Sequence, residues 1–473
     1  MSKRDPQSTH SRALEPAPLH RTFHSLPGRT AVLGVIVASL VAACATHPAQ
    51  NDLSAQHGNI TTEPQKYEVV IDAGSSGTRA YLYERNAGPD RSLTMIPIKD
   101  VNDVNDASDG KAGPLIGFDR KTNQFQQPST ANEKIDKLLT DVEKRLKQLG
   151  VSRGNVNVDV LGTAGIRGQD DVTQQAIWTN VRTAVRDSGF TQGHIGTITG
   201  KDEGLFAWLD VNYGNGSLRD AKPTEGIVEI GGASAQVAFD AGTANVPDTV
   251  AITVNDRPYR VSTASFPGLG QDEARNAMSR QADAFRCFPR GYRLENNHQG
   301  VFRLDACKHS YQQALSTELG QVKALRERIR QAPGMPFVGL SGLYYTARFF
   351  NRTAQEEYPL SKAEFDKRVI HLCRNVASVK ARGEKIQDAE RYREQCGNGA
   401  YASALLFDTL GLRNGQLVAQ DSDEGKGDVK LTWTRGYIVA KDAGYDVKPL
   451  NGEADQRQSA SFSPAQAQHA GAD

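Results

Sequence analysis

The sequence has no excess of either charge and no long apolar run. Its 473 residues include 56 Lys and Arg against 55 Asp and Glu, so the formal net charge is +1. This balance argues against a broad basic face for nucleic acid and against an acidic disordered chain. No apolar run reaches the roughly 18 residues that would predict a membrane-spanning helix. The remaining composition, 38% hydrophobic and 23% charged, is typical of a globular protein, and the length corresponds to about three average domains.

Cysteine is scarce as well. There are five, and none belongs to a C-x-x-C pair, which argues against a structural zinc site. Four of them form two local pairs, Cys287 with Cys307 and Cys373 with Cys396. Four cysteines allow three pairings, but short loops close most readily, so we expect these two disulfides. The alternative is four free thiols, which would suit a cytosolic protein.

The first 43 residues are typical of an export signal. Residues 1–29 are polar with several Lys and Arg, residues 31–43 are apolar and uncharged, and Cys44 follows directly. The small residues before Cys44 resemble the processing site of a bacterial lipoprotein, whose cysteine is acylated; a plain signal peptide is the alternative. We therefore expect an exported protein, anchored to a membrane by a lipid on Cys44, in the periplasm or on the cell surface. The polar segments 44–65 and 451–473 are predicted to be a flexible tether and a disordered tail.

Two segments far apart in the chain share one strand–turn–strand pattern. In the first, a predicted strand at 67–71 ends in the turn 72–79, and a strand resumes at 80–84. In the second, a predicted strand at 226–230 ends in the turn 231–234. Each turn contains Gly and hydroxyl residues beside a carboxylate, so we interpret the pair as an internal duplication. A duplication predicts an α/β protein with two similar domains that face each other.

Other elements follow from periodicity. Apolar residues with a 3.6-residue period predict a helix over 131–149, and Thr130 and Glu133 have the spacing of a capping box at its start. Further strands are expected at 156–160, 195–199 and 337–341, and a helix at 400–410.

The two turns have the composition of phosphate-binding loops. Successive backbone N–H groups in such a turn form a concavity that binds anions, and glycine lets a phosphate approach the backbone. One turn of this kind would be an ordinary hairpin turn. Two of them, flanked by Asp72 and Glu229, predict a site that holds a polyphosphate from two sides, with a hydrated divalent cation beside the carboxylates.

The same segments resemble the apyrases, the nucleoside triphosphate diphosphohydrolase family. Their order and spacing hold from residue 67 to residue 439, nearly the whole chain after the leader. No single segment identifies the family, but the occurrence of all of them in the same order does. Segments similar to the five conserved regions are 72–79, 163–167, 202–208, 229–236 and 337–345, and segments similar to the intervening and later parts are 259–266, 268–275, 396–401 and 433–436.

This resemblance implies an actin-like fold of two ribonuclease-H-like domains, with the active site in the cleft between them. Domain I would comprise residues 66–199, with 428–450 returning to it, and domain II residues 200–427, which contain both cysteine pairs. The implied reaction is hydrolysis of nucleoside tri- or diphosphates (ATP, ADP, GTP, GDP or UDP) to the monophosphate, dependent on Mg²⁺ or Ca²⁺. No nucleic-acid partner is implied, and we expect a monomer.

The resemblance also implies roles for single residues. Glu203 matches the catalytic base, which takes a proton from the attacking water. Ser234 and Gln236 match the residues that orient that water. Asp72 and Glu229 match those that hold the waters of the metal ion. The residues expected near the phosphates are Gly74, Ser75, Ser76, Gly77, Thr78, Arg79, Thr163, Ala164, Arg167, Gly231, Gly232 and Ala233.

The fifth region implies a nucleobase site at Tyr344 and Tyr345, where we expect one ring to stack on the base and the other to lie in the core. Two positions depart from the family pattern. Glu229 stands where Asp is usual, and we expect it still to reach a metal-bound water while changing the metal preference. The segment 205–208 lacks the usual glycine before Trp208, a difference that we assign to packing.

Two other functions remain open at this stage. An exopolyphosphatase would share the fold and the first turn, but would lack the Glu203–Gly204 pair with Trp208 and the paired cysteines, and would be cytoplasmic. A nucleotide-binding sensor or chaperone would keep the turns without needing Glu203, Ser234 and Gln236 together.

Overall fold

The computed structural model describes most of the chain between residues 65 and 450. The described residues are 65–87, 92–98, 110–119, 124–220, 222–294, 298–332, 334–350, 357–359, 361–385, 392–413, 417–420, 431–447 and 450. The predicted leader, Cys44, the tether and the C-terminal tail lie outside them. The described residues fall within one compact unit, Glu63–Asp473.

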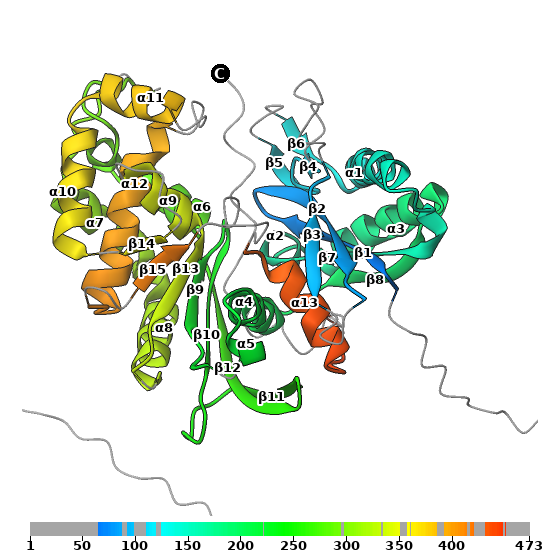
Figure 1. Ribbon diagram of the computed structural model, residues 1–473. Helices are drawn as coiled ribbons and strands as arrows, with labels where there is room; N and C mark the ends of the chain where they lie inside the picture. The colour runs from blue at the N-terminus through cyan, green and yellow to red at the C-terminus, as the bar shows by residue number, and fades with distance from the viewer. Residues whose placement is uncertain are drawn as a thin grey trace, which may run out of the picture. The chain divides into compact units, whose positions relative to one another are not determined.

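The first part of the described chain forms a mixed sheet in the order β3-β2-β1-β7-β8. Helices α1 (Ala131–Gln148) and α3 (Asp171–Ser188) pack on it through a buried cluster that includes Val69 and Ile71 of β1 (Figure 1). The strands are β1 (Tyr67–Gly74), β2 (Gly77–Arg85), β3 (Leu93–Ile96), β7 (Val156–Gly162) and β8 (Thr191–Thr197), with β4 (Lys111–Ala112) on β2 and a separate ribbon of β5 (Gly117–Asp119) and β6 (Gln124–Gln126).

The second part forms another mixed sheet, in the order β11-β12-β10-β9-β13-β15-β14. Its strands are β9 (Gly226–Ile230), β10 (Ser234–Asp240), β11 (Thr249–Val254), β12 (Arg257–Pro267), β13 (Phe337–Ser341), β14 (Glu357–Pro359) and β15 (Leu417–Gln420). Its helices are α6 (Gln271–Ser279), α7 (Leu304–Ala314), α8 (Leu319–Gln331), α9 (Gly342–Phe350), α10 (Lys362–Cys373), α11 (Val376–Lys385) and α12 (Tyr392–Ser403).

The two sheets repeat one pairing pattern. In the first, β1 pairs antiparallel with β2 and parallel with β7, and β7 pairs parallel with β8. In the second, β9 pairs antiparallel with β10 and parallel with β13, and β13 pairs parallel with β15. The next strand outward is also equivalent: β3 pairs antiparallel with β2 in the first sheet, and β12 pairs antiparallel with β10 in the second. The predicted α/β class is confirmed, and the repeated topology agrees with an internal duplication; the domain boundaries remain predictions.

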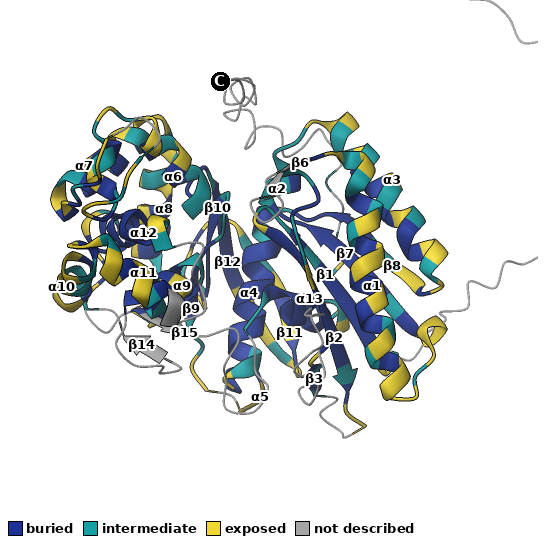
Figure 2. Ribbon diagram, turned by 90° about the horizontal axis from the view of Figure 1, so that it is seen from above, coloured by how far each residue is buried: buried dark blue, intermediate teal, exposed yellow. Residues whose placement is uncertain are grey.

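Helices α4 (Gly200–Gly214) and α13 (Trp433–Asp442) pack together and against both sheets. Val70 of β1 and Ile227 of β9 share one buried cluster with Phe206 of α4 and Ile438 of α13. Figure 2 shows α4 buried along most of its length, as expected for a helix covered on several sides. The contact is close at Gly436, where an added Cβ would lie 1.8 Å from the carbonyl oxygen of Phe206.

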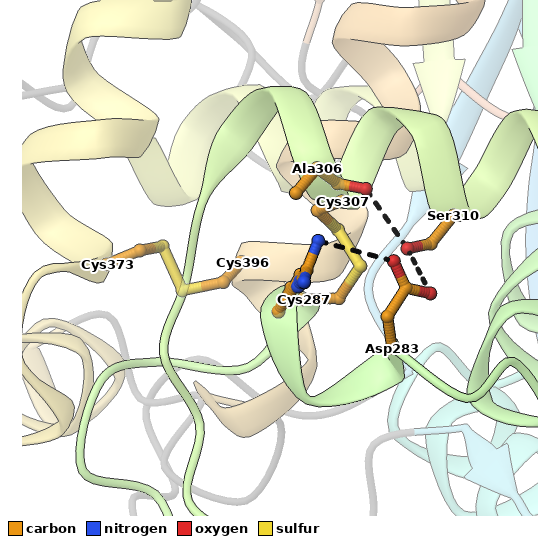
Figure 3. Close-up of a disulfide and its surroundings, with 8 residues drawn as sticks. Asp283, Cys287, Ala306, Cys307, Ser310, Cys373 and Cys396 are labelled. Atoms are coloured by element: carbon orange, nitrogen blue, oxygen red, sulfur yellow. Dashed lines mark hydrogen bonds and ion pairs between the residues drawn. A yellow bond between two sulfur atoms is a disulfide. The ribbon is translucent and has the colours of Figure 1, made fainter.

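Both predicted disulfides form, Cys287–Cys307 and Cys373–Cys396 (Figure 3). They join helices of the second part, α10 to α12 and the 3-10 turn Ala284–Cys287 to α7. No helix among the described residues is long and apolar enough to cross a membrane.

Two local predictions need correction. The helix predicted over 131–149 is present, but the Thr130 side chain donates to the carbonyl of Gln127 and does not cap it, because a 3-10 turn precedes the helix. The helix predicted at 400–410 begins at Tyr392 and changes at Ala404 into a π-helix that ends at Thr409.

The α4–α13 contact gives a stability prediction. Gly436→Ala is expected to lower the free energy of unfolding by about 2 kcal/mol or more, because the methyl group collides with backbone that cannot rotate away. Urea unfolding measures the change. Gly320→Ala in α8 is the matched control, since a Cβ there meets nothing within 4 Å, and it should leave stability unchanged or slightly higher. Equal stability of the two variants would contradict the packing argument.

Candidate active site

The two glycine-rich turns are in contact. A Cβ on Gly232, in the β9–β10 turn, would lie 2.4 Å from the Oγ of Ser75 in the β1–β2 turn. A Cβ on Gly165, in the short helix α2 (Ala164–Arg167), would lie 2.6 Å from the Cα of Ser75. A larger residue at Gly165 would collide with the backbone of Ser75, so glycine is required there, whereas at Gly232 the Ser75 side chain would have to rotate away. The structure thus brings together three of the segments expected to bind phosphate.

Not every residue predicted near the phosphates is free for that purpose. Thr78 is fully buried, and its hydroxyl donates to the carbonyl of Gly113. Thr163 is 5% exposed and is the residue before α2. Arg79 lies close enough to Asp72 for its charge to lower the pKa of that carboxyl, against the larger effect of burial.

Three carboxylates, Asp72, Glu203 and Glu229, form a cluster beside the turns. Burial raises the pKa of Asp72 to about 7, and the negative charge of Glu203 adds to this effect. Burial raises the pKa of Glu229 to about 8, followed by the charge of Glu203, while the hydrogen bond from Ser341 opposes the rise. Burial also raises the pKa of Glu203, opposed by Arg167. Close carboxylates with little water cannot all ionise without a compensating positive charge.

Three oxygens in this region are buried without a hydrogen-bond partner: Asp72 Oδ1, Glu229 Oε2 and Gln236 Oε1. Buried polar atoms normally have partners, so each one needs an explanation. Among the described residues, no group of three His, Cys, Asp or Glu side chains could hold a metal ion directly. The two carboxylate oxygens instead fit a cation such as Mg²⁺, which keeps most of its water ligands and needs only one or two carboxylates.

Glu203 lies in the first turn of α4 and is 6% exposed. Its Oε2 accepts hydrogen bonds from Arg167 at 3.1 Å and from Gln236 Nε2 at 3.3 Å. The same Nε2 donates to the hydroxyl of Ser234 at 2.6 Å. Glu203, Gln236 and Ser234, for which the family resemblance implies roles as base and water-orienting residues, therefore lie in one hydrogen-bonded set.

Two further residues join the site that sequence patterns did not assign. Ser265 of β12 accepts a hydrogen bond from Gln236 at 3.3 Å; it lies in the segment 259–266 that resembles the family's middle part. Ser341, at the end of β13, donates to Glu229 Oε1 at 2.6 Å. Its φ of 57° is left-handed, a conformation that costs a non-glycine residue about 1–2 kcal/mol. Backbone strain of this kind is concentrated at functional sites.

The two tyrosines predicted to contact the nucleobase have different environments, although both lie in α9. Tyr344 is 1% exposed and belongs to the core of the second part, whereas Tyr345 is 43% exposed. The prediction of a stacking ring therefore rests on Tyr345.

The fold class is confirmed by comparison with solved structures. A structure of nucleoside triphosphate hydrolases from Neospora caninum matches with a TM-score of 0.50 at 16% identity, covering 80% of this chain and 92% of that one. The predicted actin-like arrangement of two similar halves is therefore correct.

Sequence comparison identifies the family. The profile of the GDA1/CD39 (nucleoside phosphatase) family matches residues 59–448. Probable apyrase 4 from Arabidopsis thaliana is 27% identical over 417 residues, 80% of this chain and 79% of the relative. Ectonucleoside triphosphate diphosphohydrolase 3 from Mus musculus is 23% identical over 446 residues, 81% and 80% of the two chains. The protein belongs to the GDA1/CD39 nucleoside phosphatase family.

The carboxylate cluster predicts a pH-dependent stability in the absence of divalent cations. Folded Glu229 keeps its proton up to about pH 8, whereas an unfolded glutamate ionises near pH 4.3. The unfolded state therefore binds fewer protons within this window, and the free energy of unfolding should fall as the pH rises from about 5 to 8.

Glu229→Gln is expected to reduce this fall, because the amide does not ionise. Urea unfolding at several pH values, in the presence of a chelator, measures the slope. Glu133→Gln, which changes an exposed glutamate of α1, is the control and should keep the wild-type slope. An unchanged slope in Glu229→Gln would contradict the raised pKa.

Proposed function

We propose that this protein hydrolyses the terminal phosphoanhydride bond of nucleoside tri- and diphosphates, with Glu203 as the general base. The observation that supports this most directly is the hydrogen-bonded set of Glu203, Gln236 and Ser234 beside two glycine-rich turns in contact. Hydrolysis of a phosphoanhydride needs little covalent help from the protein and much positioning and charge compensation.

In this proposal, Oε2 of Glu203 holds the carboxylate in place and Oε1 accepts the proton. Both of its hydrogen bonds among the described residues go to Oε2, from Arg167 and Gln236. These bonds fix the carboxylate and leave Oε1 to accept the proton of the attacking water. The raised pKa of Glu203 makes its carboxylate a stronger base than an ordinary glutamate. Ser234 and Gln236 Oε1 supply the polar atoms that orient the water.

In this proposal, the phosphates are bound by backbone N–H groups of the two turns and by the Arg167 side chain. The turns approach each other at Ser75 and Gly232, so a phosphate chain held there would contact both. Arg167 donates through one nitrogen to the carbonyl of Ile198 and through the other to Glu203. It is thereby held close to the base, where its charge can compensate that of a phosphate. Tyr345 is our candidate for stacking on the nucleobase.

Asp72 and Glu229 would hold Mg²⁺ or Ca²⁺ through its water ligands, using the two oxygens that otherwise have no partner. Such a cation neutralises phosphate charge when bound. Ser341 fixes the other oxygen of Glu229, so the longer glutamate side chain presents Oε2 in a defined direction.

A polyphosphate substrate is the second candidate, since the fold is compatible with it. Nucleotides are favoured because the matched family is one of nucleoside phosphatases and because Tyr345 offers an exposed ring near the end of β13.

The role of Glu203 is tested by Glu203→Gln, which keeps the hydrogen-bonding shape and removes the base. Phosphate release from ATP and ADP should fall by about 100-fold or more, since general bases contribute 10²–10⁴-fold. The assay covers ATP, ADP, GTP, GDP, UDP, pyrophosphate and long polyphosphate, each with and without chelator. Glu133→Gln, also a first-turn helix glutamate, should keep full activity. Wild-type rates in Glu203→Gln would reject the base, and release from polyphosphate alone would favour the second candidate.

We also propose that the protein is exported and attached to a membrane through a lipid on Cys44, in the periplasm or at the cell surface, as a monomer. The two disulfides support export, because such bonds persist in oxidising compartments.

Anchoring is tested with the full chain expressed in a bacterial host fed labelled palmitate. The wild-type protein should carry the label and sediment with membranes. Cys44→Ser should lose both properties and keep its nucleotidase activity, because Cys44 is not among the residues proposed to bind or cleave the substrate. Unlabelled wild-type protein in the soluble fraction would indicate a plain signal peptide.

A further inference from the structure

We infer that Tyr445, beyond the C-terminal end of α13, is a positioning residue for the catalytic base. The inference rests on the proposed role of Glu203. Tyr445 donates a hydrogen bond of 2.6 Å to Oδ1 of Asp202, the residue immediately before Glu203. Tyr445 lies within residues 59–448, which the family profile matches, but outside the individual segments whose resemblance to the family was read from the sequence, the last of which is 433–436.

Asp202 is a buried carboxylate whose partners define the start of α4. It is 6% exposed. Its Oδ2 accepts hydrogen bonds from the backbone N–H and the hydroxyl of Thr199, at 3.2 and 2.8 Å, and Thr199 caps the backbone N–H of Asp202 in return. The capping box satisfies only Oδ2, and among the described residues Tyr445 donates the hydrogen bond that Oδ1 accepts. Removal of this hydroxyl would leave a buried charged oxygen underpaired, which is costly.

Glu203 depends directly on this first turn. Its backbone N–H donates to the carbonyl of Thr199 at 3.1 Å, the first hydrogen bond of the helix. A shift of Asp202 therefore moves the Cα of Glu203. Since reacting groups must be placed to within about 1 Å, and misplacement by that amount costs up to about 100-fold in rate, the effect on catalysis can be large without any lost substrate contact.

Tyr445 itself is rigidly held. Its backbone N–H donates to the carbonyl of Ala440 at 2.9 Å, and the preceding Gly444 has a φ of 76° and donates to Lys441. This is the left-handed turn that commonly ends a helix. The ring of Tyr445 lies edge-on to Phe206, one turn along α4 from the base, with 6.1 Å between centroids. Tyr445, just beyond the end of α13, thus contacts α4 at both Phe206 and Asp202.

Tyr445→Phe tests the inference, because it keeps the ring packing and removes the hydroxyl. In the full-length protein with ATP and Mg²⁺, kcat should fall about 10-fold while KM stays within twofold. Tyr437→Phe is the matched control: Tyr437 also packs edge-on to Phe206, at 5.5 Å, but the carboxylates that act on its hydroxyl are those of Asp159 and Glu68. This control should keep kcat within twofold, whatever its thermal stability. Circular dichroism at the assay temperature measures the folded fraction of each variant. The value of kcat is then calculated per folded molecule, so that unfolding is not mistaken for a slower reaction.

A double-mutant cycle separates positioning from general destabilisation. Asp202→Asn should lower kcat, and Tyr445→Phe in that background should change kcat by less than twofold, because the hydrogen bond is already altered. Wild-type kcat in Tyr445→Phe, an equal loss in Tyr437→Phe, or fully multiplicative effects in the cycle would each overturn the inference. Glu203→Gln run in parallel distinguishes the causes: activity retained there rejects the base itself, whereas an inactive Glu203→Gln beside an unaffected Tyr445→Phe rejects only the positioning role.

Discussion

The structure depends on the burial of three carboxylates within reach of each other's charge. Negative groups removed from water must be protonated, paired or bound to a cation. Here Arg167 pairs with Glu203, Ser341 donates to Glu229, and the charge of Arg79 acts on Asp72. These interactions compensate the cluster only in part, since the pKa values of Asp72 and Glu229 stay raised. The remaining imbalance is what a hydrated cation and its phosphate ligand would relieve.

The position of α4 connects this cluster to the whole fold. Most of its residues are buried between two sheets and α13, and the polar ones have specific partners. Asp210, for example, pairs with Arg435 of α13 at 2.7 Å, and its carboxylate also accepts from the backbone N–H of Thr432. A helix held on so many sides has little freedom to rotate. Glu203 therefore gains its orientation from packing that involves both halves of the protein.

Sequence patterns predicted much of this arrangement for identifiable reasons. The strands at 67–71 and 226–230 could be recognised because short apolar runs end in glycine-rich turns, and the two disulfides because their loops are short. The capping of the helix after Thr130 was predicted wrongly, since a motif of four residues cannot report the 3-10 turn that redirects the side chain. Ser341 lies in the segment 337–345 that resembles the family, but nothing in that pattern indicated its contact with Glu229, and Tyr445 gave no signal. Their roles arise from a left-handed backbone angle and from a contact between residues more than two hundred positions apart, neither of which a local pattern contains.

The disulfides are distributed unevenly over the molecule. Both close loops within residues 287–396, and the first sheet, which contains Asp72 of the proposed site, has no disulfide among the described residues. The first part is therefore held together by its hydrophobic core and by noncovalent polar contacts such as the buried ion pair of Arg85 with Glu68, whereas disulfides join helices of the second part. Reduction of these disulfides would therefore act on the helices of the second part, and not directly on the segment that contains Asp72 and the first glycine-rich turn.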